Sequence, residues 1–177
     1  MIVNKSRVLG TKFIAIILMG IYFSSPLFAS AATLAFNPEY IISDEEMQST
    51  ANWTTTDIQK FLQDRGSYLA TLTTADLNGQ IKPAAQIIHE AAQGYQINPK
   101  YILVTLQKEQ SLITDDTPTQ KQLDWAAGYG VCDSCSMEDP KVIKFKGFGK
   151  QVDNAAGIIR WYYNNTNQSV VKKKDQN

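Results

Sequence analysis

The longest regular pattern of apolar positions lies in residues 97–113, INPKYILVTLQKEQSLI. Asn98 is a favourable N-cap, and Pro99 suits the first helical position because its missing N–H would have no partner there. The largely apolar run 101–106 leaves almost no polar face, which is typical of a helix buried on most sides. The pattern therefore predicts a buried helix that begins at Pro99 and carries Glu109 near its C-terminal end.

Apolar residues recur at helical spacing in further segments of the chain. The other expected helices lie at about 54–65, 83–94, 122–127 and 149–163. Gly94 is expected to end the second of these, because glycine enters the left-handed conformation at low cost. Residues 131–148 contain several turn-forming residues and indicate a loop or a short hairpin. The sequence thus predicts a mainly α fold with one loop-rich segment.

Glu109 is the candidate for acid–base chemistry. A carboxylate near a helix C-terminus faces the negative end of the helix dipole, and partial burial adds a desolvation cost. Both effects are expected to raise its proton affinity, which suits a general acid. The alternative is a solvated glutamate whose charge is balanced by Lys108, since structural carboxylates outnumber catalytic ones.

The segments around this helix bear a family resemblance. Gly94, Tyr95, Ile97, Asn98 and Pro99 are followed by nine residues and then Glu109, and later by DWAAGYGV and FGKQVDNAAGIIRWYY. This succession resembles the lysozyme-like, soluble-lytic-transglycosylase-like domains of exported bacterial proteins, over about residues 81–163. The resemblance implies a lysozyme-like helical domain.

The resemblance also implies an activity, which is cleavage of the β-1,4 bond between N-acetylmuramic acid and N-acetylglucosamine in peptidoglycan. A single Glu109 would protonate the glycosidic oxygen and then take a proton from the muramic C6 hydroxyl, closing a 1,6-anhydro ring. A hydrolase would instead need a second carboxyl, about 5–5.5 Å away if retaining or about 6.5–9.5 Å away if inverting. The candidates for that second carboxyl, each also suited to capping a loop, are Asp115, Asp116, Asp124 and Asp133.

Substrate contacts are expected close to Glu109. Tyr129, between two glycines, is the preferred aromatic residue of the groove, and Tyr162 is a further candidate. Gln110 and Ser111 follow Glu109 directly. Trp125 and Trp161 are expected to fill the core instead.

The sequence departs from the family pattern at two points. The family has serine directly after the catalytic glutamate, whereas Gln110 separates Glu109 from Ser111. The family's Gly-Leu-Met-Gln segment appears as residues 128–131, GYGV, without its glutamine. A catalytically inactive module that binds wall glycan or a surface partner is therefore the alternative function.

The first thirty-one residues have the pattern of a secretory signal peptide. Lys5, Arg7 and Lys12 precede an apolar core, and a small-residue site, Ala-Ser-Ala, ends at Ala31. The alternative is an uncleaved membrane anchor, which would be the chain's only contact with a membrane.

The expected organisation is a signal peptide (1–31), an N-terminal extension with one helix (32–80), the lysozyme-like domain (81–163) and a disordered tail (164–177). We expect a secreted or cell-surface monomer.

Charge and cysteine content narrow the remaining functions. The chain has 17 Lys and Arg and 17 Asp and Glu. Cleavage of the signal peptide would remove basic residues and no acidic ones, so the mature chain would be mildly acidic, which gives no support for nucleic-acid binding.

Cys132 and Cys135 are expected to form a local disulfide in an exported protein. A thioredoxin-like role, the redox alternative, would need a strand before the first cysteine, and 128–131 shows none. No metal or cofactor is expected. A zinc site made of four Cys and His ligands is impossible within one chain, because the sequence has two cysteines and one histidine, His89.

Overall fold

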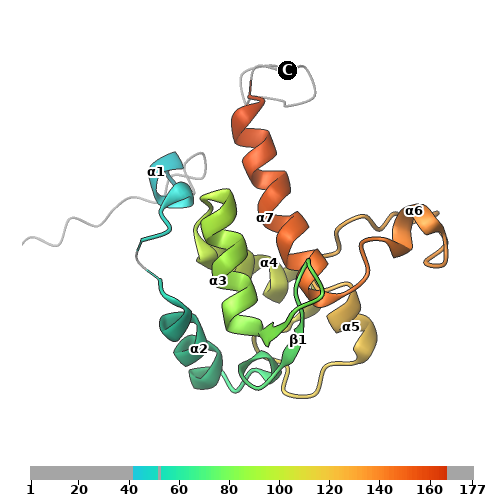
Figure 1. The fold of residues 1–177 in the computed structure, drawn as a ribbon, viewed down its shortest axis with the longest axis horizontal. Coiled ribbons are helices and arrows are strands. Elements are labelled where there is room, and N and C mark those ends of the chain that lie inside the picture. Colours follow the sequence, from blue (N-terminus) through green and yellow to red (C-terminus); the bar gives the residue numbers. More distant parts are fainter. Residues whose placement is uncertain (1–41, 52, 167–177) are drawn as a thin grey trace, which may run out of the picture. The chain divides into compact units, whose positions relative to one another are not determined.

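The computed structural model describes residues 42–51 and 53–166, and all of them belong to one compact unit. Within this part the chain forms seven α-helices, one 3₁₀ turn and a two-stranded sheet (Figure 1). The predicted signal segment, and the tail from residue 167, lie outside the described residues. The mainly α prediction is confirmed. The elements are α1 (Asp44–Gln48), α2 (Thr55–Asp64), η1 (Tyr68–Ala70), β1 (Thr73–Ala75), β2 (Ile81–Pro83), α3 (Ala84–Tyr95), α4 (Pro99–Gln110), α5 (Gln120–Asp124), α6 (Pro140–Ile143) and α7 (Phe148–Asn164).

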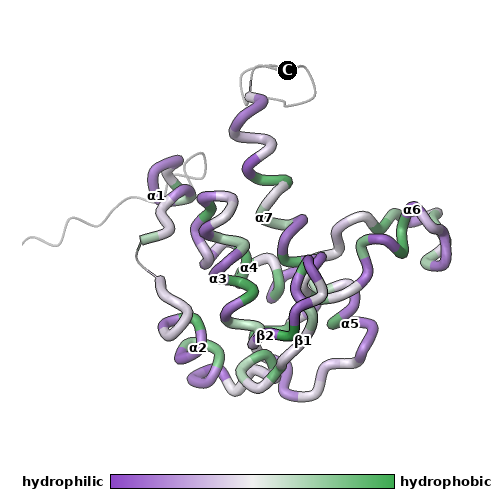
Figure 2. Tube along the Cα trace, viewed as in Figure 1, coloured by the Kyte–Doolittle hydropathy of each residue, from purple (hydrophilic) through white to green (hydrophobic). Residues whose placement is uncertain are grey.

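The core forms around α3, which packs against α2, α4 and α7. Apolar and polar residues alternate along α2 and α3, whereas α1 is mostly hydrophilic and buries none of its residues (Figure 2). Small residues let α7 approach α3 closely, since a Cβ on Gly157 would lie 3.2 Å from Cζ of Tyr95. The fully buried members of the core include Ile58, Leu62, Ile88, Ala92, Leu106, Val152 and Ala156. Among the described residues, no helix is both long and apolar enough to cross a membrane.

The helix ends follow local capping rules at some positions and tertiary contacts at others. The Thr54 side chain and Asp57 form a capping box at the start of α2, and the chain turns at Gly66 with φ +66°. The expected stop at Gly94 is wrong, because α3 continues to Tyr95 and the left-handed residue is Gln96, with φ 52°.

Arg160 on α7 compensates for this strained helix end. Its guanidinium donates to the backbone oxygens of Tyr95 and Gln96 and to the side chain of Gln48. The first and third of these bonds measure 2.6 and 2.9 Å. A cation at the C-terminal end of a helix also meets the negative end of its dipole. Arg160 therefore connects α7, α3 and α1.

Residues 131–148, predicted as a loop or a short hairpin, form a loop that contains the short helix α6. The hairpin lies earlier in the chain, where β1 and β2 pair antiparallel with Thr74 opposite Lys82. Asp76 closes the turn after β1 by accepting hydrogen bonds from the backbone N–H groups of Asn78 and Gln80. The first turn of α7 lies so close to this turn that a Cβ on Gly149 would clash with the oxygen of Ala75 and would lie 2.6 Å from Cα of Asp76.

The segment predicted as an N-terminal extension, 32–80, is part of the same packed unit where it is described. Its helix α2 contributes Ile58 and Leu62 to the core, and its last residues lead directly into β2. The short α1 adds a further helix to the single one expected. Asn98 holds α1 through bonds from its backbone and side-chain nitrogens to the oxygens of Met47 and Glu46.

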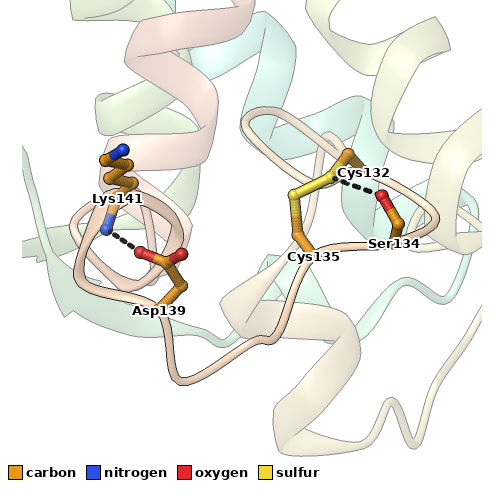
Figure 3. Close-up of a disulfide and its surroundings, with 5 residues drawn as sticks. All are labelled: Cys132, Ser134, Cys135, Asp139 and Lys141. Atoms are coloured by element: carbon orange, nitrogen blue, oxygen red, sulfur yellow. Dashed lines mark hydrogen bonds between the residues drawn. A yellow bond between two sulfur atoms is a disulfide. The ribbon is translucent and has the colours of Figure 1, made fainter.

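The loop between α5 and α6 is closed by the predicted disulfide. Cys132 and Cys135 are bonded, with 5.2 Å between their Cα atoms, and Ser134 lies inside the small ring (Figure 3). Asp139 then caps α6 by accepting a hydrogen bond from the backbone N–H of Lys141 at 2.8 Å. The bridge thus restrains the loop shortly after α5 ends.

Candidate active site

Glu109 is the penultimate residue of α4, and local sequence explains its position. Asn98 caps the helix by accepting the N–H of Lys100, Pro99 follows, and Leu106 anchors the last turn in the core. The side chain of Glu109 is 36 % exposed, and its Oε1 atom lies 3.1 Å from the ammonium of Lys108. Lys108 itself is largely exposed, so this pair is a surface contact of small energetic value.

Glu109 lines a groove of about 540 Å³ between α4, α5 and the disulfide loop. Trp125, only 6 % exposed, supplies an aromatic surface to this groove, and Val131 and Met137 add apolar area. The remaining lining residues are Gln110, Lys121, Gln122 and Gly128. The groove therefore combines one carboxylate with an aromatic residue, two amides and a lysine, a combination typical of small-molecule and sugar sites.

The glycine turn after α5 lies against the carboxylate. Gly128 has φ +65°, and a Cβ built on it would lie 3.2 Å from Oε2 of Glu109. Gly130 has φ +75°, and a Cβ there would clash with the ring of Phe145. Glycine at both positions thus permits the turn conformation and a close approach on either side of Tyr129.

A buried amide on α7 holds this turn. Gln151 is fully buried, and its Oε1 accepts from the N–H groups of Ala127 (3.3 Å) and Tyr129 (2.9 Å). Its Nε2 donates to the oxygens of Tyr129 (3.0 Å) and Phe145 (2.9 Å), so the side chain uses its full hydrogen-bonding capacity.

Gln151 is not among the site residues predicted from the sequence. The available signal was its place on the apolar face of the last helix, three residues after Phe148 and four before Ala155. A polar residue on such a face is expected to have buried partners.

The other predicted substrate residues are distributed differently. Gln110 lines the groove of Glu109, whereas Ser111 is the exposed C-cap of α4, with φ 59°, and does not line it. Tyr129 packs edge-to-face on Phe145 and lines a neighbouring hollow. Tyr162 is exposed on α7 beside Trp161.

The neighbouring hollow has a volume of about 460 Å³ and is rich in aromatic residues. Its lining residues are Tyr95, Tyr129, Asn154, Gly157, Ile158 and Trp161. The expectation that Trp161 fills the core is wrong, because it is 40 % exposed and belongs to this hollow. For Trp125 the expectation is confirmed, because this side chain is buried, although it also lines the groove of Glu109. Gly128 lines the groove of Glu109 and Tyr129 lines the neighbouring hollow. The turn that contains both residues therefore separates the two depressions.

Tyr101, on the same helix as Glu109, is partly buried. Burial raises the pKa of the Tyr101 phenol, and the charges of Glu109 and Tyr162 act in the same direction, whereas Thr105 and Lys108 lower this pKa.

The candidates for a second carboxyl lie outside the groove of Glu109. Asp115 accepts hydrogen bonds from Thr117 and Gln122, and Asp124 pairs with Lys146 at 3.4 Å. Neither these residues nor Asp116 and Asp133 line the groove, where Glu109 is the only acid. The described part of the chain also contains no group of three or more His, Cys, Asp or Glu residues placed to hold a metal ion.

The fold and the groove define a mainly helical domain that presents one carboxylate beside a turn held by a buried amide. The chain belongs to the family of the LasA N-terminal domain, whose family model matches residues 40–177. No curated protein and no solved structure matches the chain. This is not the lysozyme-like transglycosylase family expected from the sequence, and the resemblance to that family is limited to the motifs around Glu109.

Proposed function

We propose that the protein is an exported peptidoglycan-cleaving enzyme of the lytic transglycosylase type, with Glu109 as its acid and base. The observation that carries this proposal is the placement of Glu109, a partly shielded carboxylate that is the only acid of its groove and lies against the Gly128 turn. A general acid needs a fixed position beside the leaving oxygen, and the bonds of Gln151 supply such rigidity to the turn.

The proposed cycle uses one carboxyl group. Protonated Glu109 donates its proton to the glycosidic oxygen between N-acetylmuramic acid and N-acetylglucosamine, and that bond breaks. The carboxylate then accepts the proton of the muramic C6 hydroxyl, whose oxygen closes the 1,6-anhydro ring. Because the groove has no second acid, its composition favours this route over the two-carboxyl mechanism of a hydrolase.

Both depressions offer groups suited to sugar rings. The groove provides the amides of Gln110 and Gln122, and the neighbouring hollow provides Tyr129 and Trp161 for stacking. A glycan strand that crosses the turn at residues 128–129 would contact both. Tyr162, exposed on the same helix as Trp161, is a further contact in this proposal, whereas Ser111 is a contact only if the C-cap of α4 moves.

The family relation supports action at the cell wall. The LasA N-terminal domain is associated with a secreted cell-wall-lytic protein. Export of this chain would follow from the signal-peptide pattern of residues 1–31.

The test is digestion of purified peptidoglycan by the wild-type chain and by Glu109→Gln. The substitution preserves shape but removes the transferable proton, so we expect a loss of about 10²-fold or more in rate, with little change in folding. The control, Glu45→Gln, makes the same change at an exposed position of α1 and should digest normally. Products that carry 1,6-anhydro-muramic ends would identify a transglycosylase, and reducing ends would contradict that mechanism in favour of a hydrolase.

The second candidate is a catalytically inactive module that binds wall glycan or a surface partner. Two departures from the transglycosylase pattern favour it, because Gln110 separates Glu109 from Ser111 and the segment 128–131 lacks the glutamine of that pattern. Retention of the wild-type chain on peptidoglycan without any cleavage product would establish this alternative.

A further inference from the structure

A second groove, beside α2 and the earlier turns of α4, has a mostly apolar surface. It has a volume of about 520 Å³ and shares no lining residue with the groove of Glu109. Side chains from α2 and the residues that flank it, from α4 and from residues 113–114 form it. Its lining residues are Trp53, Phe61, Arg65, Lys100, Leu103, Val104, Gln107, Ile113 and Thr114.

The apolar surface of this groove is open to solvent. Val104, which the sequence pattern assigns to a buried helix, is 63 % exposed. Trp53 and Phe61 pack edge-to-face, with ring centres 5.4 Å apart, and both are only partly buried. Contiguous exposed apolar area of this kind on a soluble domain indicates an interaction surface.

Two cations lie over the aromatic rings of the groove. The guanidinium carbon of Arg65 is 5.2 Å from the ring centre of Phe61, and Nζ of Lys100 is 5.4 Å from that of Trp53. No lining residue is acidic, and among the residues that the structure describes neither cation forms an ion pair with a carboxylate. The groove thus carries two positive charges in a chain whose acids and bases are equal in number.

The polar groups of the groove are already engaged with each other. The amide of Gln107 accepts the N–H of Ile113 at 3.1 Å and donates to the hydroxyl of Thr114 at 3.1 Å. Few hydrogen-bonding groups therefore remain for the many hydroxyls of a sugar, which would leave those hydroxyls poorly satisfied.

We propose that this groove binds an acidic peptide segment of a partner protein. An aliphatic or aromatic side chain of the segment fills the space beside Val104 and Phe61, and flanking carboxylates pair with Arg65 and Lys100. Charge complementarity selects this partner, because a basic segment would meet two uncompensated cations. The groove is a protein-docking surface, independent of the glycan site proposed around Glu109.

The test uses the full chain and three synthetic peptides, followed by ¹H–¹⁵N NMR. The probe is Glu-Asp-Phe-Leu-Asp-Glu, the charge control replaces each acid by lysine, and the apolar control replaces Phe-Leu by Ala-Ala. The probe should shift resonances of α2 and of the first half of α4, and neither control should. Arg65→Glu combined with Lys100→Glu should weaken the binding about tenfold or more.

A matched control is available on another face. Lys144 also lies over an aromatic ring, 4.7 Å from the centre of Phe145, but does not line this groove. Lys144→Glu should bind the probe as the wild type does. The double variant Arg65→Glu, Lys100→Glu is expected to cleave peptidoglycan and bind glycan as the wild type does. Failure of the docking proposal would therefore leave the proposed function of Glu109 unaffected.

Four outcomes would overturn the proposal. They are the absence of shifts at millimolar peptide, equal shifts with the lysine peptide, stronger binding of phosphatidylglycerol vesicles than of the peptide, and concentration-dependent self-association that Val104→Asp abolishes. The last two would assign the groove to a membrane surface and to a second copy of the chain.

Discussion

Glu109 on α4 and Gly128 after α5 are packed so closely that a methyl group on Gly128 would lie 3.2 Å from Oε2 of the carboxylate. The two residues are 19 positions apart in the sequence, yet the backbone of the turn forms one wall beside the carboxylate of Glu109. The conformation of this turn therefore determines where the carboxylate can point.

Substitution of Gly128 by alanine should separate backbone strain from this contact. Gly128→Ala adds a side chain at φ +65°, which costs about 1–2 kcal/mol of stability, and also pushes the Glu109 carboxylate aside. Gly66→Ala is the matched control, because Gly66 has φ +66° and nothing within 4 Å of the added Cβ. Thermal unfolding should show similar losses for both variants, and only Gly128→Ala should lose peptidoglycan cleavage. Equal activity of the two would show that the contact is unimportant.

Gln151→Leu should affect both folding and the site. Leucine would leave the N–H of Tyr129 and the oxygens of Tyr129 and Phe145 without their buried partner. The expected loss in the free energy of unfolding is about 3 kcal/mol or more, measured by urea denaturation. Gln86→Leu, whose amide bonds only to Glu90 on a helix surface, should change stability by about 0.5 kcal/mol or less.

Activity of the still-folded Gln151→Leu fraction tests the positioning role. Cleavage per folded molecule should fall while affinity for peptidoglycan changes little, because the turn would lose its fixed conformation beside Glu109. Unchanged cleavage per folded molecule would make Gln151 a purely structural residue.

Removal of the disulfide should have a modest effect on stability and a local effect on the groove. Closing so short a loop contributes about 2 kcal/mol or less in the chain-entropy account. The Cys132→Ser, Cys135→Ser double variant should unfold at slightly lower urea, and its residues Val131 and Met137, which line the groove, should become more mobile by NMR. Two free thiols in protein recovered outside the cytoplasm would contradict the bridge.

The stability of the fold should respond to pH through Asp153. Burial raises the pKa of Asp153 above its ordinary value near 3.8, and the hydrogen bond from the Tyr95 hydroxyl at 3.0 Å opposes this only in part. An acid with a higher pKa in the folded state favours folding while protonated, and this contribution is lost as pH rises through the folded-state pKa. Asp153→Asn keeps an acceptor for Tyr95 and should raise the unfolding temperature at pH 7, with no gain at pH 3. A lower unfolding temperature at pH 7 would mean that the charge stabilises the fold.

Local signals explain which parts of this structure are predictable from the sequence. Asn98 with Pro99, and Thr54 with Asp57, act within one helical turn, so the starts of α4 and α2 can be read directly. The close pair of cysteines likewise requires only a short loop and an oxidising compartment.

Tertiary contacts explain the features that the sequence does not reveal. The strands β1 and β2 have three residues each, too few for an alternating pattern, and the close approach of Gly149 to the turn after β1 fixes their place on the helices. Trp161 lines a hollow together with Tyr95 because α7 packs on α3, a contact between segments far apart in the sequence. Gln151 belongs to the candidate site only because α7 crosses the turn that follows α5.

The glycine turn has a thermodynamic consequence for long ligands. Gly128 belongs to the groove, Tyr129 belongs to the neighbouring hollow, and the turn that contains both is held by the single side chain of Gln151. If a glycan spans this turn as proposed, it meets a surface whose conformation is fixed before binding, so little conformational entropy of the protein is lost. Loss of the Gln151 bonds would then weaken a glycan long enough to span the turn more than a short one that occupies a single depression.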